Sequence, residues 1–323
     1  MNNYNFLEKI LHRLALSSQL MREVTFDLDS KIKLANNEKN NHVFITGLAR
    51  SGTTILLNAI YQSDFFASLT YADMPFVLAP NLWSKISFQK NEYILKERAH
   101  GDGIKFGINS PEAFEEVFWK TFNENEPDTF INFKIYIDKI RNKYNKERYL
   151  SKNNQNLKRI NLISKYLPEA KILIPFREPI QHAYSLLTQH KKFIEYSKID
   201  KFIGKYMKLI GHTEFGPNYI PIYKENLHFL DDLDINHWIE QWYIAYNHSL
   251  KTLKDKKNIY FLSYEKLCNS EEYWLEILNI LDIKNYYKFN FLESKKEIEL
   301  PIENKIKDKA FSVFNELNKL ILD

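Results

Sequence analysis

The sequence predicts an α/β protein with a mostly parallel central sheet flanked by helices. Short apolar runs typical of buried strands alternate with longer segments of helical spacing, which is the pattern of βαβ units. One of the strongest runs leads directly through a glycine-bounded loop into an apolar helix. The 323 residues, 44% hydrophobic and 27% charged, have the composition of an ordinary globular protein.

Four apolar runs are expected to form the parallel strands. They are residues 43–46 (VFIT), 149–151 leading into Lys152, 172–176 (ILIPF) and 259–262 (IYFL). Each is followed by a segment that favours a helix: 53–61, 156–166, 179–192 and the run after Ser270. Two further amphipathic stretches are expected to cover a face of the sheet and to close the chain, 235–253 and 306–322.

The alternation indicates a single domain over residues 1–323. We expect a helical extension over 1–40, an α/β core over 41–285 and a C-terminal helical segment over 286–323. The periodicity is weak within the core at about 89–148, where we expect an insertion of loops and lid-like helices.

Composition excludes some classes of function. A net charge of +4 is too small to indicate a nucleic-acid-binding protein. The single cysteine, Cys268, allows no intrachain disulfide and no cysteine metal site, and no His/Cys/Asp cluster has ligand spacing, so no metal is expected. No apolar run is long enough for a membrane span, and the N-terminus lacks the pattern of a signal peptide. The expected location is the cytoplasm.

The loop after the first strand has the features of a phosphate site. Residues 47–54 (GLARSGTT) place two glycines around a turn that opens a helix, where free N–H groups and the helix dipole attract an anion. The spacing is that of a nucleotide P-loop, but Thr53 stands where that motif has lysine. The strand 172–176 also ends in Arg177 instead of an acidic residue for magnesium. Together with Arg50 inside the loop, this favours a phosphosulfate over a metal-bound triphosphate.

A second anion site is predicted at the end of strand 172–176. Arg177 follows that strand at the edge where open parallel sheets bind ligands, and its guanidinium suits a phosphate. Pro179 is placed to open the next helix, and Ser185 lies about two turns into it. Two separate anion sites are what a 3′,5′-bisphosphorylated nucleotide requires.

These motifs resemble those of the sulfotransferases that use 3′-phosphoadenosine 5′-phosphosulfate (PAPS). Residues 47–54 resemble the family's 5′-phosphosulfate loop, close to the form in tyrosylprotein and bacterial carbohydrate members. Arg177 and Ser185 resemble the 3′-phosphate pair. Residues 149–153 (YLSKN) and 261–267 (FLSYEKL) are similar to the strand ending in lysine and to the late strand whose tyrosine borders adenine. The likeness runs from about 41 to 283 and implies a P-loop NTPase-like fold.

The resemblance implies roles for individual residues. Arg50 takes the place of the family's catalytic cation, Lys152 is a second candidate cation, and Tyr264 borders the adenine. The 5′-phosphate is held by the loop residues Ser51, Gly52, Thr53 and Thr54. Sulfuryl transfer is an in-line displacement in which charge builds on the leaving oxygen, so fixed cations and N–H groups are its main catalytic resource.

The sequence leaves the catalytic base open. Asp73 follows Arg50 at about the interval at which several family members have a glutamate. The rival is His100, which stands with Asp102 among glycines, and Glu112 is a further carboxylate nearby.

The function expected is transfer of a sulfuryl group from PAPS to a hydroxyl or amine acceptor. A carbohydrate or glycan precursor is the preferred acceptor, with another small molecule or a peptide as alternatives. Two other readings stay open: a divergent P-loop small-molecule kinase and a non-catalytic nucleotide-binding protein. All three share the fold, so the fold does not decide among them. The sequence does not indicate the oligomeric state.

Overall fold

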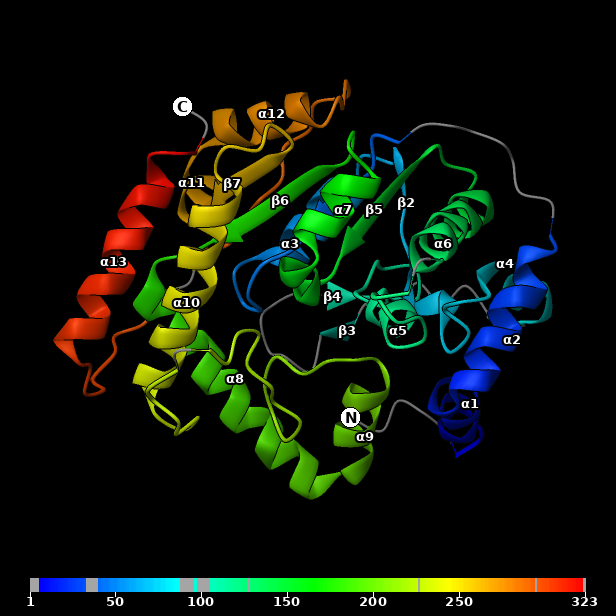
Figure 1. Cartoon of the computed structure of the whole chain (residues 1–323), viewed down its shortest axis with the longest axis horizontal. Coiled ribbons are helices and arrows are strands. Elements are labelled where there is room, and N and C mark those ends of the chain that lie inside the picture. The colour runs from blue at the N-terminus through cyan, green and yellow to red at the C-terminus, as the bar shows by residue number, and fades with distance from the viewer. Residues whose placement is uncertain are drawn as a thin grey trace.

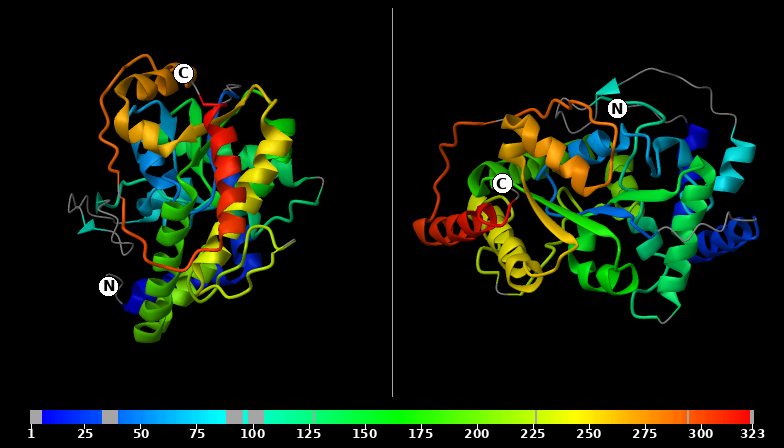
Figure 2. Two further views of the ribbon diagram at one scale, coloured as in Figure 1. Left: turned by 90° about the vertical axis from the view of Figure 1, so that its left-hand side faces the viewer. Right: turned by 90° about the horizontal axis from the view of Figure 1, so that it is seen from above.

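The computed structural model describes residues 6–32, 40–87, 96–97, 105–126, 128–225, 227–293 and 295–321. Within them a twisted central sheet runs through the molecule with helices on both faces (Figures 1 and 2). Its five strands have the order β2 (Phe66–Ala67), β5 (Arg148–Lys152), β1 (Val43–Ile45), β6 (Lys171–Phe176) and β7 (Ile259–Ser263). Every pairing between neighbours in this sheet is parallel. The α/β class predicted from the sequence is confirmed.

Alternating side chains of the strands build two separate cores. Val43 and Ile45 of β1 lie in the core that holds α3 (Thr53–Tyr61), α11 (Tyr264–Asn269) and α12 (Glu271–Ile280). Phe44, between them, points into the larger core on the other face. Strand side chains alternate between faces, so a central strand covered on both sides is apolar throughout.

Five helices supply most of the helical side chains in the larger core, and Ala15, Leu16 and Phe26 of the N-terminal helices also join it. The five helices are α6 (Thr129–Tyr144), α7 (Ile160–Tyr166), α8 (Pro179–Ile199), α10 (Ile235–Leu253) and α13 (Asn304–Asn318). The other described elements are α1 (Phe6–Ser17), α2 (Gln19–Ser30), α4 (Pro80–Ile86), α5 (Glu116–Trp119), α9 (Lys201–Leu209), the 3₁₀ turns η1 (Tyr71–Asp73) and η2 (Asn154–Lys158), and the hairpin β3 (Lys96–Glu97) with β4 (Lys105–Phe106). None of the described helices is long and apolar enough to cross a membrane.

The region expected to hold loops and lid-like helices contains a core helix instead. Helix α6 packs against β2 and β5 at one edge of the sheet, and Phe133, Tyr136 and Ile140 on it are fully buried. Apolar residues fall on several sides of the helix over 130–137 (FINFKIYI), which obscures its helical stripe in the sequence. Packing against the sheet decides its structure.

Candidate anion-binding and active site

The loop 47–52 joins the carboxyl end of β1 to the N-terminus of α3. Arg50 has φ 71° and Gly52 has φ 98°, so the chain turns tightly twice before the helix begins. A Cβ at Gly52 would lie 2.3 Å from Cδ2 of Tyr264, so only glycine lets that ring pack directly against the loop. The loop thereby presents the first N–H groups of α3 to one side of the sheet edge.

Side chains of two helices anchor this loop and the strand end before it. Nε2 of His182, in α8, lies 2.7 Å from the carbonyl oxygen of Ala49. Burial lowers the pKa of His182 to about 3, so the ring is neutral and donates Nε2–H to that carbonyl. The hydroxyl of Tyr246, in α10, donates to the carbonyl oxygen of Pro175 at 2.8 Å, beside the start of the loop. His182 is therefore a structural histidine under the loop.

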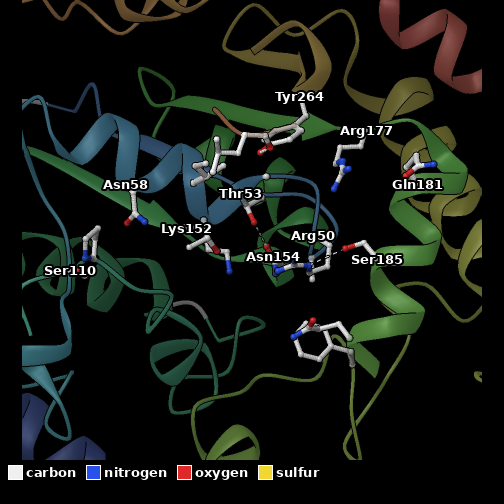
Figure 3. Close-up of a pocket in the computed structure, with 18 of the residues that line it drawn as sticks. Arg50, Thr53, Asn58, Ser110, Lys152, Asn154, Arg177, Gln181, Ser185 and Tyr264 are labelled. Atoms are coloured by element: carbon white, nitrogen blue, oxygen red, sulfur yellow. Dashed lines mark hydrogen bonds between the residues drawn. The ribbon is translucent and has the colours of Figure 1, made fainter. Parts of the chain in front are cut away.

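The residues of the two anion sites predicted from the sequence lie next to each other. Nε of Arg50 donates to Oγ of Ser185 at 3.2 Å, which links the loop to α8 (Figure 3). Arg177 directly follows β6 with 9% of its surface exposed, and its guanidinium carbon lies 5.2 Å from the centroid of the Tyr264 ring. The loop and the Arg177 site thus belong to one continuous pocket.

Lys152 reaches the same pocket from β5. It pairs in register with Ile45 of β1 and is 4% exposed, so its stem is enclosed by the sheet edge. Asn154 follows it, and its amide oxygen accepts from the Thr53 hydroxyl at 3.3 Å. The carboxyl ends of β1, β5 and β6 therefore meet at one place, as expected for an open parallel sheet.

The pocket has a volume of about 810 Å³, within the range of small-molecule sites. Its lining includes most of the residues predicted from the sequence: Arg50, Gly52, Thr53, Thr54, Lys152, Arg177, Ser185 and Tyr264. Ser51 does not line it; this residue is fully buried. The lining also contains Lys192 and Lys296, which the sequence analysis did not identify.

The pocket is strongly cationic. The described lining holds five lysine or arginine side chains and no aspartate or glutamate. At the end far from Arg177 and Gln181 the lining changes to neutral polar groups, and Figure 3 shows Asn58 and Ser110 there. A polyanion fits the cationic end, and a neutral hydroxyl compound fits the other. No group of three or more His, Cys, Asp or Glu in the described ranges could hold a metal ion.

Asp73 does not lie in this lining. It is fully buried, and its Oδ2 accepts from the backbone N of Thr70 at 2.7 Å and from the hydroxyl of Tyr144 at 2.6 Å. Oδ1 is paired with Lys143. The carboxylate caps the η1 turn and anchors it to α6, which is a structural role.

The other candidate bases differ in position. Glu112 accepts from the hydroxyl of Tyr71 at 2.7 Å and is not part of the pocket lining, although its neighbours Ser110 and Pro111 are. His100 and Asp102 lie outside the described residues. Of the sequence candidates for the base, the two that the structure describes, Asp73 and Glu112, therefore do not line the pocket.

A histidine–carboxylate pair lies on the pocket instead. His212 lines it, and Nδ1 of this ring lies 2.6 Å from Oε2 of the buried Glu214. Sequence reasoning missed this pair, although a signal was present. Gly211 and Gly216 bracket it, both with positive φ, in a chain with only eight glycines.

A glycine-bounded loop at the carboxyl edge of a parallel sheet, facing a cationic pocket, is an arrangement by which α/β proteins bind phosphate-like anions. The sequence profile of the sulfotransferase family matches residues 42–284, and the chain belongs to that family. The protein is therefore a transferase, and the resemblance seen in the motifs is confirmed.

Two solved structures are similar to this chain. Sulfotransferase STF1 from Mycobacterium tuberculosis H37Rv is 12% identical, with a TM-score of 0.49 over 95% of this chain and 81% of its own. Sulfotransferase STF9 from Mycobacterium avium is 12% identical, with a TM-score of 0.48 over 100% of this chain and 80% of its own. No curated protein sequence matches the chain significantly.

Proposed function

We propose that the protein transfers the sulfuryl group of PAPS to a hydroxyl acceptor. The observation that carries the proposal is the pocket lining, whose described residues include five cations and no carboxylate around the loop before α3. A nucleotide with phosphates at both ends of its ribose needs two anion sites on one surface, and the loop and Arg177 supply them. The kinase reading lacks support because Thr53 replaces the lysine of that motif.

We infer the roles of the residues from their positions on the pocket. The N–H groups at the start of α3, with Thr53 and Thr54, hold the 5′-phosphate, and Arg177 with Ser185 holds the 3′-phosphate. The ring of Tyr264, packed on Gly52, offers a face to the adenine.

Two cations serve the reacting group. Arg50 and Lys152 neutralise the charge that builds on the sulfuryl oxygens and on the leaving phosphate oxygen. The reaction is an in-line displacement that needs no metal for its charge balance, because fixed cations take that part.

We propose a carbohydrate or glycan precursor as the acceptor. The pocket end away from Arg177 is lined by amides, a hydroxyl and an aromatic ring: Asn58, Tyr61, Gln62, Asn109 and Ser110. Amides bind sugar hydroxyls in both directions, and a tyrosine face packs against the apolar face of a sugar ring.

The test is thermal stabilisation by adenosine 3′,5′-bisphosphate, compared with ATP plus magnesium. At one hundred times its dissociation constant a ligand adds about 2.7 kcal/mol, which is visible as a shift of Tm. We expect the bisphosphate to give this shift and Arg177→Ala to remove it. Lys305→Ala, a control on α13 away from the pocket, should keep it. A shift with magnesium ATP alone would overturn the proposal in favour of a kinase.

Turnover separates the enzyme from a nucleotide-binding protein. Arg50→Ala should lower the rate of sulfuryl transfer far more than it weakens bisphosphate binding, because Arg50 acts where charge develops. Equal losses in both would assign Arg50 to nucleotide binding alone.

A further inference from the structure

The chain between α9 and α10 carries a histidine into the pocket at a fixed position. Gly211 has φ 80°, and a Cβ there would lie 2.4 Å from Cγ of Glu116, so the chain passes this point only as glycine. The next N–H, that of His212, donates to the carbonyl oxygen of Met207 at 2.8 Å and closes the end of α9. The backbone is therefore fixed at the point where the chain enters His212.

The carboxylate of Glu214 orients the ring. Nδ1 of His212 and Oε2 of Glu214 are 2.6 Å apart, and the two side chains are 16% and 8% exposed. The second oxygen, Oε1, accepts from the amide of Asn154 at 3.3 Å. Asn154 in turn accepts from Thr53 of the phosphate loop, so a chain of contacts connects the loop to the histidine.

The charge state of this pair is set by its surroundings. Burial raises the pKa of Glu214, but the close contact with His212 and the charge of Lys152 outweigh it, and the pKa falls to about 2. Glu116, the other carboxylate of this cluster, is compensated by Arg159 at 2.7 Å. Glu214 is therefore ionised at any pH at which the protein works.

An ionised carboxylate at 2.6 Å fixes the tautomer of the ring. Two lone pairs would repel at that distance, so Nδ1 carries its proton on the side of Glu214. In the neutral form of the ring the proton acceptor is therefore Nε2, on a side chain that lines the pocket. This is the arrangement in which a histidine acts as a general base.

We propose that His212 is the general base that takes the proton of the acceptor hydroxyl, with Glu214 as its positioning residue. This rests on the proposed sulfuryl transfer. The acceptor O–H proton moves to Nε2 of His212 as the acceptor oxygen forms a bond to sulfur. The bond from sulfur to the 5′-phosphate oxygen breaks, and its electron pair leaves with adenosine 3′,5′-bisphosphate. The imidazolium then returns its proton to solvent, so the net products are the sulfate ester, the bisphosphate and one proton.

The test compares His212→Gln with wild type on two probes. These are 4-nitrophenol, whose hydroxyl ionises readily near neutral pH, and 4-nitrobenzyl alcohol, whose hydroxyl does not. Sulfate release from PAPS to water gives the same comparison without an organic acceptor. Loss of a base should slow transfer to the alcohol and to water by about 10²- to 10⁴-fold. Transfer to the phenol should fall much less, a contrast that a merely structural loss would not produce.

The chain offers a matched control. His228 pairs with Glu240 at 2.8 Å, but its side chain is 76% exposed and is not part of the pocket lining. His228→Gln should leave both rates unchanged. Retention of the wild-type rate on the alcohol and on water by His212→Gln would overturn the base role.

A measurement that needs no turnover checks the tautomer. Nitrogen-15 spectra of histidine-labelled protein should show His212 with its proton on Nδ1, and Glu214→Gln should shift the ring toward the other tautomer. A proton on Nε2 in the wild type would overturn the proposal. The Tm shift with the bisphosphate distinguishes the two hypotheses. If the wild type shows no shift, the proposed use of PAPS as donor is contradicted. If the shift is present but His212→Gln keeps the wild-type rates, only the role of His212 as base is contradicted.

Discussion

Gly52 is the position in the loop 47–52 that tolerates a side chain least. Its φ of 98° and the 2.3 Å approach of Tyr264 to a Cβ both oppose any side chain. Gly52→Ala should lower the free energy of unfolding by about 1–3 kcal/mol and weaken bisphosphate binding. Urea unfolding checks this within a double-mutant cycle. In a Tyr264→Ala background, Gly52→Ala should lower the free energy of unfolding by less, because the clash with the ring is gone and only the backbone strain remains. Strictly additive costs would contradict a contact between the two residues.

Asp73 supplies a second prediction for a single residue. Asp73→Asn leaves Lys143 without its buried counter-charge and should lower the free energy of unfolding by about 3–5 kcal/mol. Bisphosphate should still raise Tm, because Asp73 does not line the pocket. Urea unfolding and turnover per folded molecule separate the roles. A stable variant with turnover reduced more than a hundredfold would restore Asp73 as the base suggested by its place in the sequence.

Among the helices, α13 is held against the rest of the protein by a single stripe of apolar side chains. Ile306, Ala310, Val313 and Leu317 are buried at helical spacing, and the helix packs on α10 and α8, the helices that carry the loop supports. Leu317→Ala should cost about 2–5 kcal/mol, measured by urea unfolding. Leu320→Ala removes the same atoms from a side chain that is 40% exposed and should change stability by less than about 0.5 kcal/mol. Equal effects would show that α13 does not bury its stripe.

The clarity of the apolar period explains which helices the sequence could predict. The bounds of α3 and α10 agree with the expected 53–61 and 235–253, because each has a clear apolar period and a sharp start. Helix α6 was not anticipated as a core element, since apolar residues on several sides of it obscure its helical period. The loop residues of the site were found because their spacing is local. The pair of His212 and Glu214 is connected to the loop through Asn154, which lies far away in the sequence, so no local pattern reveals it.

For the whole molecule, the site depends on the order of the strands. β1 lies between β5 and β6, so the residues that follow these three strands reach one edge although they are far apart in the chain. Lys152 and Arg177 thereby stand on either side of the loop that follows β1. No local pattern encodes this convergence, which arises only when the sheet has formed.

Two buried histidines tie the stability of the whole fold to pH. Burial lowers the pKa of His42, whose Nδ1 accepts from the N–H of Tyr149, and that of His182 to about 3 each. Both rings titrate at 6.5 when exposed. Below that pH the unfolded chain binds more protons than the native one, so unfolding is favoured as the pH falls. Their contribution is complete above pH 6.5 and is lost as the pH falls toward 3.

The loss should amount to about 1.4 kcal/mol per pH unit for each histidine, measured as the free energy of unfolding in urea between pH 7 and pH 4. His182→Gln keeps a donor for the carbonyl of Ala49 but removes the titrating ring. The slope of the free energy of unfolding against pH should therefore fall by the contribution of one histidine. His228→Gln, at an exposed position, should keep the full slope. Glu214 adds to the loss only below pH 4.5, where its carboxylate begins to bind protons in the unfolded chain. A stability that stays constant from pH 6.5 to pH 4 would show that neither ring is buried in its neutral form, and the anchoring of the phosphate loop by His182 would then have to be abandoned.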